Sequence, residues 1–229
     1  MECPTWEVII SIPMTKPNKN KIRQTNPVYS FVVDGECEYW YLQMLKDYER
    51  SLKIHLSPAI YKKKTLKEQY QRVVELAEES KKVFWVIDFD VIYKETKEAK
   101  KGKKTPLQEF QEFYIKCKKN NKVIVIVNNP CFEFWILLHF CYTKRFFEDY
   151  KALRPYLQKY LADYEKTEKY FIRTYPDIYT RLKPILQTAI SNSEKLGEFD
   201  LKNIETGTAE MYKIFYESIF KNSYNATNH

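Results

Sequence analysis

Two aspartates, Asp88 and Asp90, complete the segment "VFWVIDFD" at residues 83–90, whose apolar run predicts a buried strand. Side chains on a strand alternate between its two faces, so the i, i+2 spacing predicts that both carboxylates lie on one face. Two carboxylates that close repel each other, and one would protonate unless a cation lay between them. A hard divalent ion such as Mg²⁺, which binds oxygen ligands, would relieve this repulsion. The alternative is that both aspartates only cap a loop in solvent.

A third aspartate, Asp34, follows another predicted strand, "VYSFVV" at residues 28–33, and precedes Gly35. Ligands of parallel α/β sheets bind beyond the carboxyl ends of the strands. The position of Asp34 at such an end therefore strengthens the interpretation of the aspartates as a metal site.

The segments that must position these carboxylates alternate between strand and helix patterns. Further strands are predicted at 52–56 and 122–127, a lysine-rich loop at 97–104, and a helix start at Thr105, where Pro106 and Gln108 complete a capping pattern. Strands that are apolar at every position, separated by helices, predict an α/β fold with a mostly parallel sheet covered by helices on both faces. The residues predicted on the inner helix faces are Tyr41, Leu42, Leu45 and Tyr48; then Leu66, Tyr70, Val73, Val74 and Ala77; then Leu107, Phe110, Tyr114 and Cys117.

The segment "NNPCFEFWILLHF" at residues 128–140 predicts a buried helix, with Asn129 and Pro130 as its cap and first turn. Glu133 falls in the first turn, where the helix dipole favours a negative charge. A buried carboxylate is costly unless it is paired or binds a cation, so Glu133 is a site candidate. The alternative is that it hydrogen-bonds nearby backbone and stabilises the fold. His139 lies on another face of the helix and is either a further site candidate or a core residue.

Composition limits the classes of function. The net charge of +8 and the pI near 9.0 favour a polyanionic partner or a solvated lysine-rich surface. Four scattered glycines exclude a P-loop and a dinucleotide-binding fingerprint. Five scattered cysteines without CxxC spacing predict neither a zinc knuckle nor a disulfide framework. The sequence shows neither a signal-peptide pattern nor an apolar run of about 20 residues, so a cytoplasmic protein that binds no membrane is expected.

Three motifs, "FVVDGECEYWYL", "VFWVIDFD" and "VIVNNPCFEFWILLHF", occur in this order between residues 31 and 140. Together they resemble the RloB family, which includes AbiL-type abortive-infection proteins of bacterial restriction and phage-defence loci. The resemblance implies a Toprim-like fold of the same α/β class. It also implies a Mg²⁺-dependent nuclease acting in anti-phage defence, with Mn²⁺ as a possible substitute and RNA such as tRNA favoured over DNA. The alternative is a non-catalytic module that binds metal, nucleic acid or a partner such as a defence ATPase.

The resemblance also assigns roles to single residues. Asp34 would act as general acid or base and contribute to the metal site, and Asp88 with Asp90 would hold the metal. The family's first motif usually has glutamate where this chain has Asp34, and threonine where it has Cys37. The shorter Asp34 reaches less far, and Glu38 or Glu36 could compensate. The remaining implied site residues are Glu38 and Glu133 as catalytic groups, and Lys100, Lys101, Lys103, Lys104 and Asn129 as nucleic-acid contacts.

The expected organisation is a lead at 1–27, an α/β core at 28–142 and a helical extension at 143–229 that packs on the core. The extension is rich in Tyr, Phe, Lys and Arg, and helices are predicted at about 177–195 and 208–221. Its aromatic residues would either stack on nucleic-acid bases or form packed core. The residues with helical spacing at its start are Leu153, Tyr156, Leu157, Tyr160, Leu161 and Tyr164.

Overall fold

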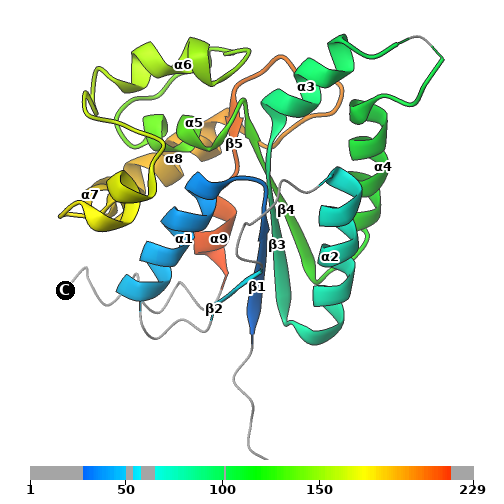
Figure 1. The fold of residues 1–229 in the computed structure, drawn as a ribbon, viewed down its shortest axis with the longest axis horizontal. Helices are drawn as coiled ribbons and strands as arrows, with labels where there is room; N and C mark the ends of the chain where they lie inside the picture. Colours follow the sequence, from blue (N-terminus) through cyan, green and yellow to red (C-terminus); the bar gives the residue numbers. More distant parts are fainter. Residues whose placement is uncertain (1–27, 50–53, 58–64, 101, 218–229) are drawn as a thin grey trace, which may run out of the picture.

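The computed structural model describes residues 28–49, 54–57, 65–100 and 102–217. Its centre is a five-stranded sheet in the order β2-β1-β3-β4-β5 (Figure 1). The strands β1 to β4 are parallel, and β5 pairs antiparallel with β4. The prediction of an α/β fold with a mostly parallel sheet is confirmed, and the fold is consistent with a Toprim-like one. The strand bounds are β1 Tyr29–Val33, β2 Ile54–Ser57, β3 Lys82–Asp88, β4 Val123–Asn129 and β5 Thr208–Ala209.

Helices cover both faces of the sheet, as predicted (Figure 1). One core lies between the sheet and α2 (Leu66–Glu79), α3 (Phe89–Lys97) and α4 (Pro106–Lys118). The other lies between the opposite face, α1 (Glu36–Tyr48), α5 (Phe132–Leu138) and the later part of the chain. That later part comprises α6 Tyr150–Leu157, η1 Lys169–Arg173, α7 Ile178–Leu182, η2 Lys183–Ile185, α8 Leu186–Leu196 and α9 Tyr212–Tyr216.

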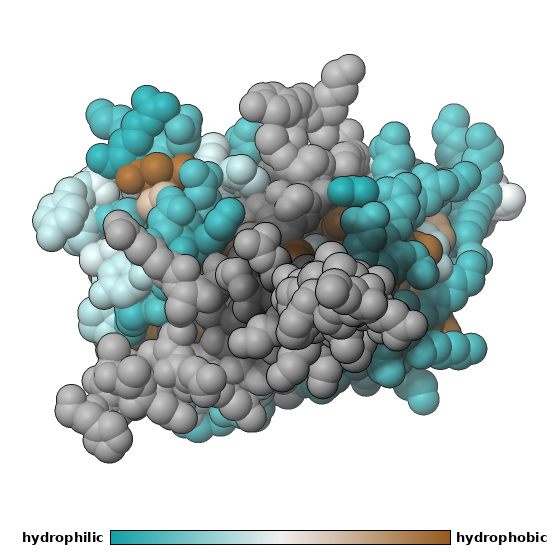
Figure 2. All heavy atoms as spheres, turned by 90° about the horizontal axis from the view of Figure 1, so that it is seen from below, coloured by the Kyte–Doolittle hydropathy of each residue, from teal (hydrophilic) through white to brown (hydrophobic). Residues whose placement is uncertain are grey.

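The register brings the carboxyl ends of the central strands together. Val33 pairs with Val86, and Asp88 pairs with Asn128. Residues that follow β1, β3 and β4 therefore meet at one end of the sheet, toward the top of Figure 1. Figure 2 shows the opposite end of the molecule, where the coloured residues are mostly hydrophilic and the hydrophobic ones form small separate patches.

The prediction that Asp88 and Asp90 share a strand face is wrong. Strand β3 ends at Asp88, and α3 begins at Phe89. The backbone N–H groups of Phe89 and Asp90 both donate to the carbonyl oxygen of Pro130, each at 2.9 Å, which turns the chain out of the sheet. The helix α3 itself was not predicted, because its polar residues merge with the lysine-rich segment that follows.

The start of α5 also differs from the prediction. Asn129 is the last residue of β4, and Cys131 rather than Asn129 stands at the helix cap. The peptide bond between Asn129 and Pro130 is cis. The predicted burial of the helix itself is confirmed, since every residue from Phe132 to Leu138 is buried.

The helix caps, inner faces and boundaries predicted from the sequence agree with the structure only in part. The capping box of Thr105 and Gln108 is confirmed. Tyr48 and Val74, predicted on inner helix faces, are 52% and 44% exposed. The helix expected at 177–195 is interrupted by the η2 turn, and the one expected from residue 208 begins as strand β5.

The helical pattern expected at the start of the extension ends early. Helix α6 stops at Leu157, and Tyr160 beyond it is 47% exposed. Leu153, Leu157, Leu161 and Tyr164 are buried, as core packing of the extension requires. Within the described residues, no helix is both long and apolar enough to span a bilayer.

Candidate metal centre

Glu38 projects from the first turn of α1 and is 1% exposed. Its side chain folds back over Gly35, so that a Cβ at Gly35 would lie 2.7 Å from Glu38 Oε2. Gly35 has an extended backbone, with φ of −123°, which any residue can adopt. The glycine is therefore needed for the space that it leaves to the Glu38 carboxylate.

Asp88 ends β3 and meets Glu38 on the α1 side of the sheet. Among the described residues, no N–H or O–H donor reaches Asp88 Oδ1 or Glu38 Oε1. The two carboxyl groups lie close enough to influence each other's protonation. Burial raises the pKa of Glu38 to about 7, with repulsion from Glu133 and Asp34 adding to the effect. Burial and the neighbouring carboxylates Glu38 and Glu133 also raise the pKa of Asp88 well above its usual value.

Glu133 enters the same space from the first turn of α5 and is fully buried. The Tyr164 hydroxyl donates to its Oε1 at 2.8 Å, and Lys166 Nζ lies 3.0 Å from its Oε2. Burial lowers the pKa of Lys166, but the Glu133 carboxylate outweighs it and the net shift is upward. Tyr164 and Lys166 follow α6 in the chain, so the extension supplies both partners of this buried carboxylate.

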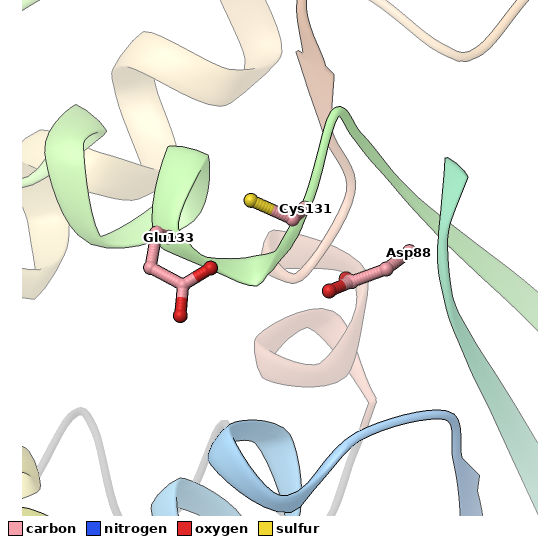
Figure 3. A group of neighbouring side chains, drawn as sticks. All are labelled: Asp88, Cys131 and Glu133. Atoms are coloured by element: carbon pink, nitrogen blue, oxygen red, sulfur yellow. The ribbon is translucent and has the colours of Figure 1, made fainter. Parts of the chain in front are cut away.

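Cys131 completes a group of possible ligands with Asp88 and Glu133. One ligand atom from each of the three side chains lies within 4.8 Å of the other two. Figure 3 shows that they come from the end of β3 and the start of α5 and point toward a common space. Burial and the Glu133 carboxylate raise the pKa of the Cys131 thiol well above its usual value, so the thiol is protonated.

The oxygen atoms at this centre fit a hard divalent cation. Asp88 and Glu133 bring carboxylates from β3 and α5 to one space, and Glu38 on α1 is close enough to repel both, which is the kind of repulsion that a cation relieves. Asn128 pairs in register with Asp88 and is fully buried. Neither atom of its amide has a hydrogen-bond partner among the residues described, which leaves an unmet polar group beside the carboxylates.

Asp90 is not part of the three-ligand group, although its charge acts on Asp88. It starts α3 and lines a groove of about 540 Å³ between α3 and α6. Burial raises its pKa to about 6. The groove has mixed charge: its other residues include Lys94, Lys97, Lys151 and Tyr150 and the acidic Glu98, Glu148 and Asp149.

Asp34 faces a different cavity. Gln69 Nε2 donates to its Oδ1 at 2.6 Å, and Gln69 Oε1 in turn accepts from Trp85 Nε1 at 3.0 Å. This cavity, of about 440 Å³, is lined by residues of α2, α3 and α4, including Glu95. Of the two first-motif carboxylates, Glu38 therefore lies on the Asp88 side of the sheet, whereas Asp34 is held by Gln69 in the other cavity.

Asn129 and His139 are engaged in the protein interior. Asn129 is 1% exposed, and its Nδ2 donates to the carbonyl oxygens of Ile204 at 2.7 Å and Thr206 at 3.0 Å. This placement disagrees with a nucleic-acid contact, because the amide already ties residues 204–206 to the sheet. His139 Nδ1 lies 3.0 Å from the Trp135 carbonyl oxygen, and burial lowers its pKa to about 4. It is a neutral core residue at the other end of α5 from Glu133.

The lysines expected to contact nucleic acid lie on the connection between α3 and α4, which projects from the body of the molecule (Figure 1). Lys100, Lys103 and Lys104 are exposed, and Lys104 pairs with Glu112 at 2.8 Å. Lys101 lies outside the described residues. Their role in binding stays a prediction.

Sequence reasoning missed four residues of this centre. Asn128 and Cys131 lie within the third motif, but its pattern does not distinguish a side chain at a site from one in the hydrophobic core. Tyr164 and Lys166 lie in a stretch where Tyr and Lys are frequent, and no spacing links them to Glu133. Only the folded chain brings them together.

A profile of the family described as "RloB-like protein" matches residues 29–217. This protein belongs to the RloB-like family. The match continues past residue 142, so the RloB-like unit includes the segment with Tyr164 and Lys166. No curated protein and no solved structure matches the chain.

Proposed function

We propose that this RloB-like protein is a Mg²⁺-dependent nuclease that hydrolyses phosphodiester bonds in anti-phage defence, with RNA favoured over DNA. The observation that carries the proposal is the convergence of Glu38, Asp88 and Glu133 at the carboxyl end of a parallel sheet. Carboxylates crowded in this way match the oxygen ligands that Mg²⁺ and Mn²⁺ take.

Asp88 and Glu133 would hold the ion, with Glu38 beside them. Bound there, Mg²⁺ would neutralise charge on the scissile phosphate and lower the pKa of an attacking water. Glu38, whose carboxyl group lies beside that of Asp88, would accept the proton of that water as general base.

Lys166 would serve the reaction by orienting Glu133 and by offsetting part of the negative charge of the cluster. A phosphodiester is an anion, and uncompensated carboxylates would repel it. The side chain of Lys166 is 38% exposed whereas that of Glu133 is fully buried, so Lys166 connects the cluster to the surface.

The groove between α3 and α6 offers a path for the nucleic acid. The ring centroid of Tyr150, which lines the groove, lies 4.0 Å from Lys166 Nζ. A strand in this groove would place its phosphates at Lys94 and Lys151, since Lys97 already pairs with Glu148, and would stack a base on Tyr150. Binding of this kind weakens as salt rises.

A second candidate is a non-catalytic module that binds metal, nucleic acid or a partner defence ATPase. Two observations favour it. The carboxylate of Asp34, to which the resemblance assigns acid–base chemistry, is bound by Gln69, and the Lys166 ammonium already pairs with Glu133.

Cleavage assays separate these functions. Labelled total RNA and plasmid DNA would be incubated with the purified chain and Mg²⁺, Mn²⁺ or EDTA. We expect metal-dependent products that disappear with Asp88→Asn and with Glu133→Gln, and that persist with Glu78→Gln, which changes an exposed carboxylate on α2. Absence of cleavage by folded protein with every metal would reject the nuclease in favour of the module.

A further inference from the structure

We propose that Asp88, Cys131 and Glu133 also form a site for a thiophilic divalent ion such as Zn²⁺ or Cd²⁺, which would use the Cys131 thiolate and exclude Mg²⁺. The binding itself is independent of the nuclease activity. Its consequence, inhibition of a Mg²⁺-dependent reaction, rests on the proposed function.

The geometry of the three side chains carries this inference. Their ligand atoms lie within 4.8 Å of one another, and all three point into one space (Figure 3). In a tetrahedral zinc site the ligand atoms are about 3.5 Å apart, given metal–ligand distances of roughly 2.0–2.3 Å. Side-chain rotations that close the group by about 1 Å would therefore suffice to complete it.

Asn128 provides an independent observation. It is fully buried, and in the described part of the chain both atoms of its amide lack a hydrogen-bond partner. Because Asn128 pairs in register with Asp88, the two side chains leave the sheet on the same face. A buried amide without partners costs about 1–3 kcal/mol, so its position beside the cluster favours a polar occupant of this space, such as an ion with its bound water.

The mixture of ligands distinguishes hard from soft ions. Mg²⁺ takes oxygen ligands and would leave the Cys131 thiol unused, whereas Zn²⁺ and Cd²⁺ bind thiolates readily. On binding, the Sγ–H bond breaks, its proton passes to solvent and an Sγ–metal bond forms, without any change of oxidation state. Tyr164 and Lys166 already fix the Glu133 carboxylate, which prepares one ligand before the ion arrives.

The chain contains a matched control for the thiol. Cys37 is also buried and lies close enough to Glu133 and Glu38 for their charges to raise its pKa, but it is outside the three-ligand group. Replacing either cysteine by serine removes one buried thiol from the same region. Only Cys131→Ser removes a proposed ligand.

The test is a titration of the purified full chain with Cd²⁺, followed by the ultraviolet charge-transfer absorption of the thiolate–cadmium bond. We expect one equivalent of Cd²⁺ to produce the band in the wild type and in Cys37→Ser. The band should be lost in Cys131→Ser and require at least about tenfold more Cd²⁺ in Asp88→Asn, a change of about 1.4 kcal/mol or more. A band that persists in Cys131→Ser, or is absent from wild-type protein with a native circular dichroism spectrum, would overturn the inference.

Activity measurements on the same proteins keep the two proposals apart. If the chain is a nuclease, Zn²⁺ should inhibit wild-type cleavage at least about tenfold more strongly than cleavage by Cys131→Ser, each relative to its own Mg²⁺ rate. A Cys131-dependent band without cleavage would support the thiophilic site and reject the nuclease. Cleavage without such a band would support the nuclease and reject the thiophilic site.

Discussion

Two polar sites lie on opposite faces of the same end of the sheet, and their carboxylates differ in the hydrogen-bond partners that they have. On the α2 side, Asp34 accepts a hydrogen bond from Gln69, which is itself anchored by Trp85. On the α1 side, no donor among the described residues reaches Glu38 Oε1 or Asp88 Oδ1, and both carboxyl groups are repelled by Glu133. A hydrogen-bond donor therefore stabilises the Asp34 carboxylate. The buried carboxyl groups around Asp88 instead repel one another, and a cation would relieve this repulsion. The comparison predicts that chemistry belongs to the α1 side, although Asp34 and Glu38 are only four residues apart.

The largest expected effect contrasts these two residues directly. Glu38→Gln should lower the rate of nucleic-acid cleavage about 100-fold or more, the usual contribution of a positioned acid–base group. Asp34→Asn should change the rate only a few-fold, because its amide oxygen can still accept the hydrogen bond from Gln69. Rates measured at saturating Mg²⁺ would decide between them. Equal losses in the two variants would show that both sites take part in catalysis.

The next effect concerns stability and pH. Burial raises the pKa of Glu38 from 4.5 to about 7, so between these values the folded state holds a proton that the unfolded chain has lost. The free energy of unfolding should therefore fall as pH rises through this window, by up to about 3 kcal/mol from this group. Urea unfolding at pH 5, 6 and 7.5 would measure the decline in wild-type protein and in Glu38→Gln.

Two comparisons sharpen this pH prediction. Glu38→Gln should show a smaller decline than the wild type, because glutamine does not titrate. Saturating Mg²⁺ should flatten the wild-type profile, since a cation stabilises the ionised carboxylates. A wild-type decline no steeper than that of Glu38→Gln would contradict the assignment of the raised pKa to Glu38.

The smallest expected effect concerns Lys166, the ammonium partner of Glu133. Lys166→Met leaves the fully buried Glu133 without its ammonium partner, and should lower the free energy of unfolding at pH 7.5 by about 2 kcal/mol, less than a fully buried pair would lose. The control is Lys104→Met, which breaks the exposed pair with Glu112 and should cost less than about 1 kcal/mol. Urea unfolding of both variants measures the difference. Equal losses would mean that Glu133 does not depend on Lys166.

The sequence by itself determined the class of the fold and the family. Apolar runs predicted the strands, the Thr105 capping box marked the start of α4, and the motif around Glu133 identified a buried helix that begins beside the candidate site. These features depend on residues close together in the chain, where periodicity and capping are local properties.

Only the tertiary structure decided which carboxylates meet. Strand β3 ends at Asp88 because the N–H groups of Phe89 and Asp90 find the carbonyl oxygen of Pro130, a contact that the local pattern does not encode. The same applies to Asp34, whose partner Gln69 lies on α2, and to Glu133, whose partners Tyr164 and Lys166 come from the extension. A buried polar group needs a partner wherever the fold can supply one, and for these residues the partners lie far along the chain.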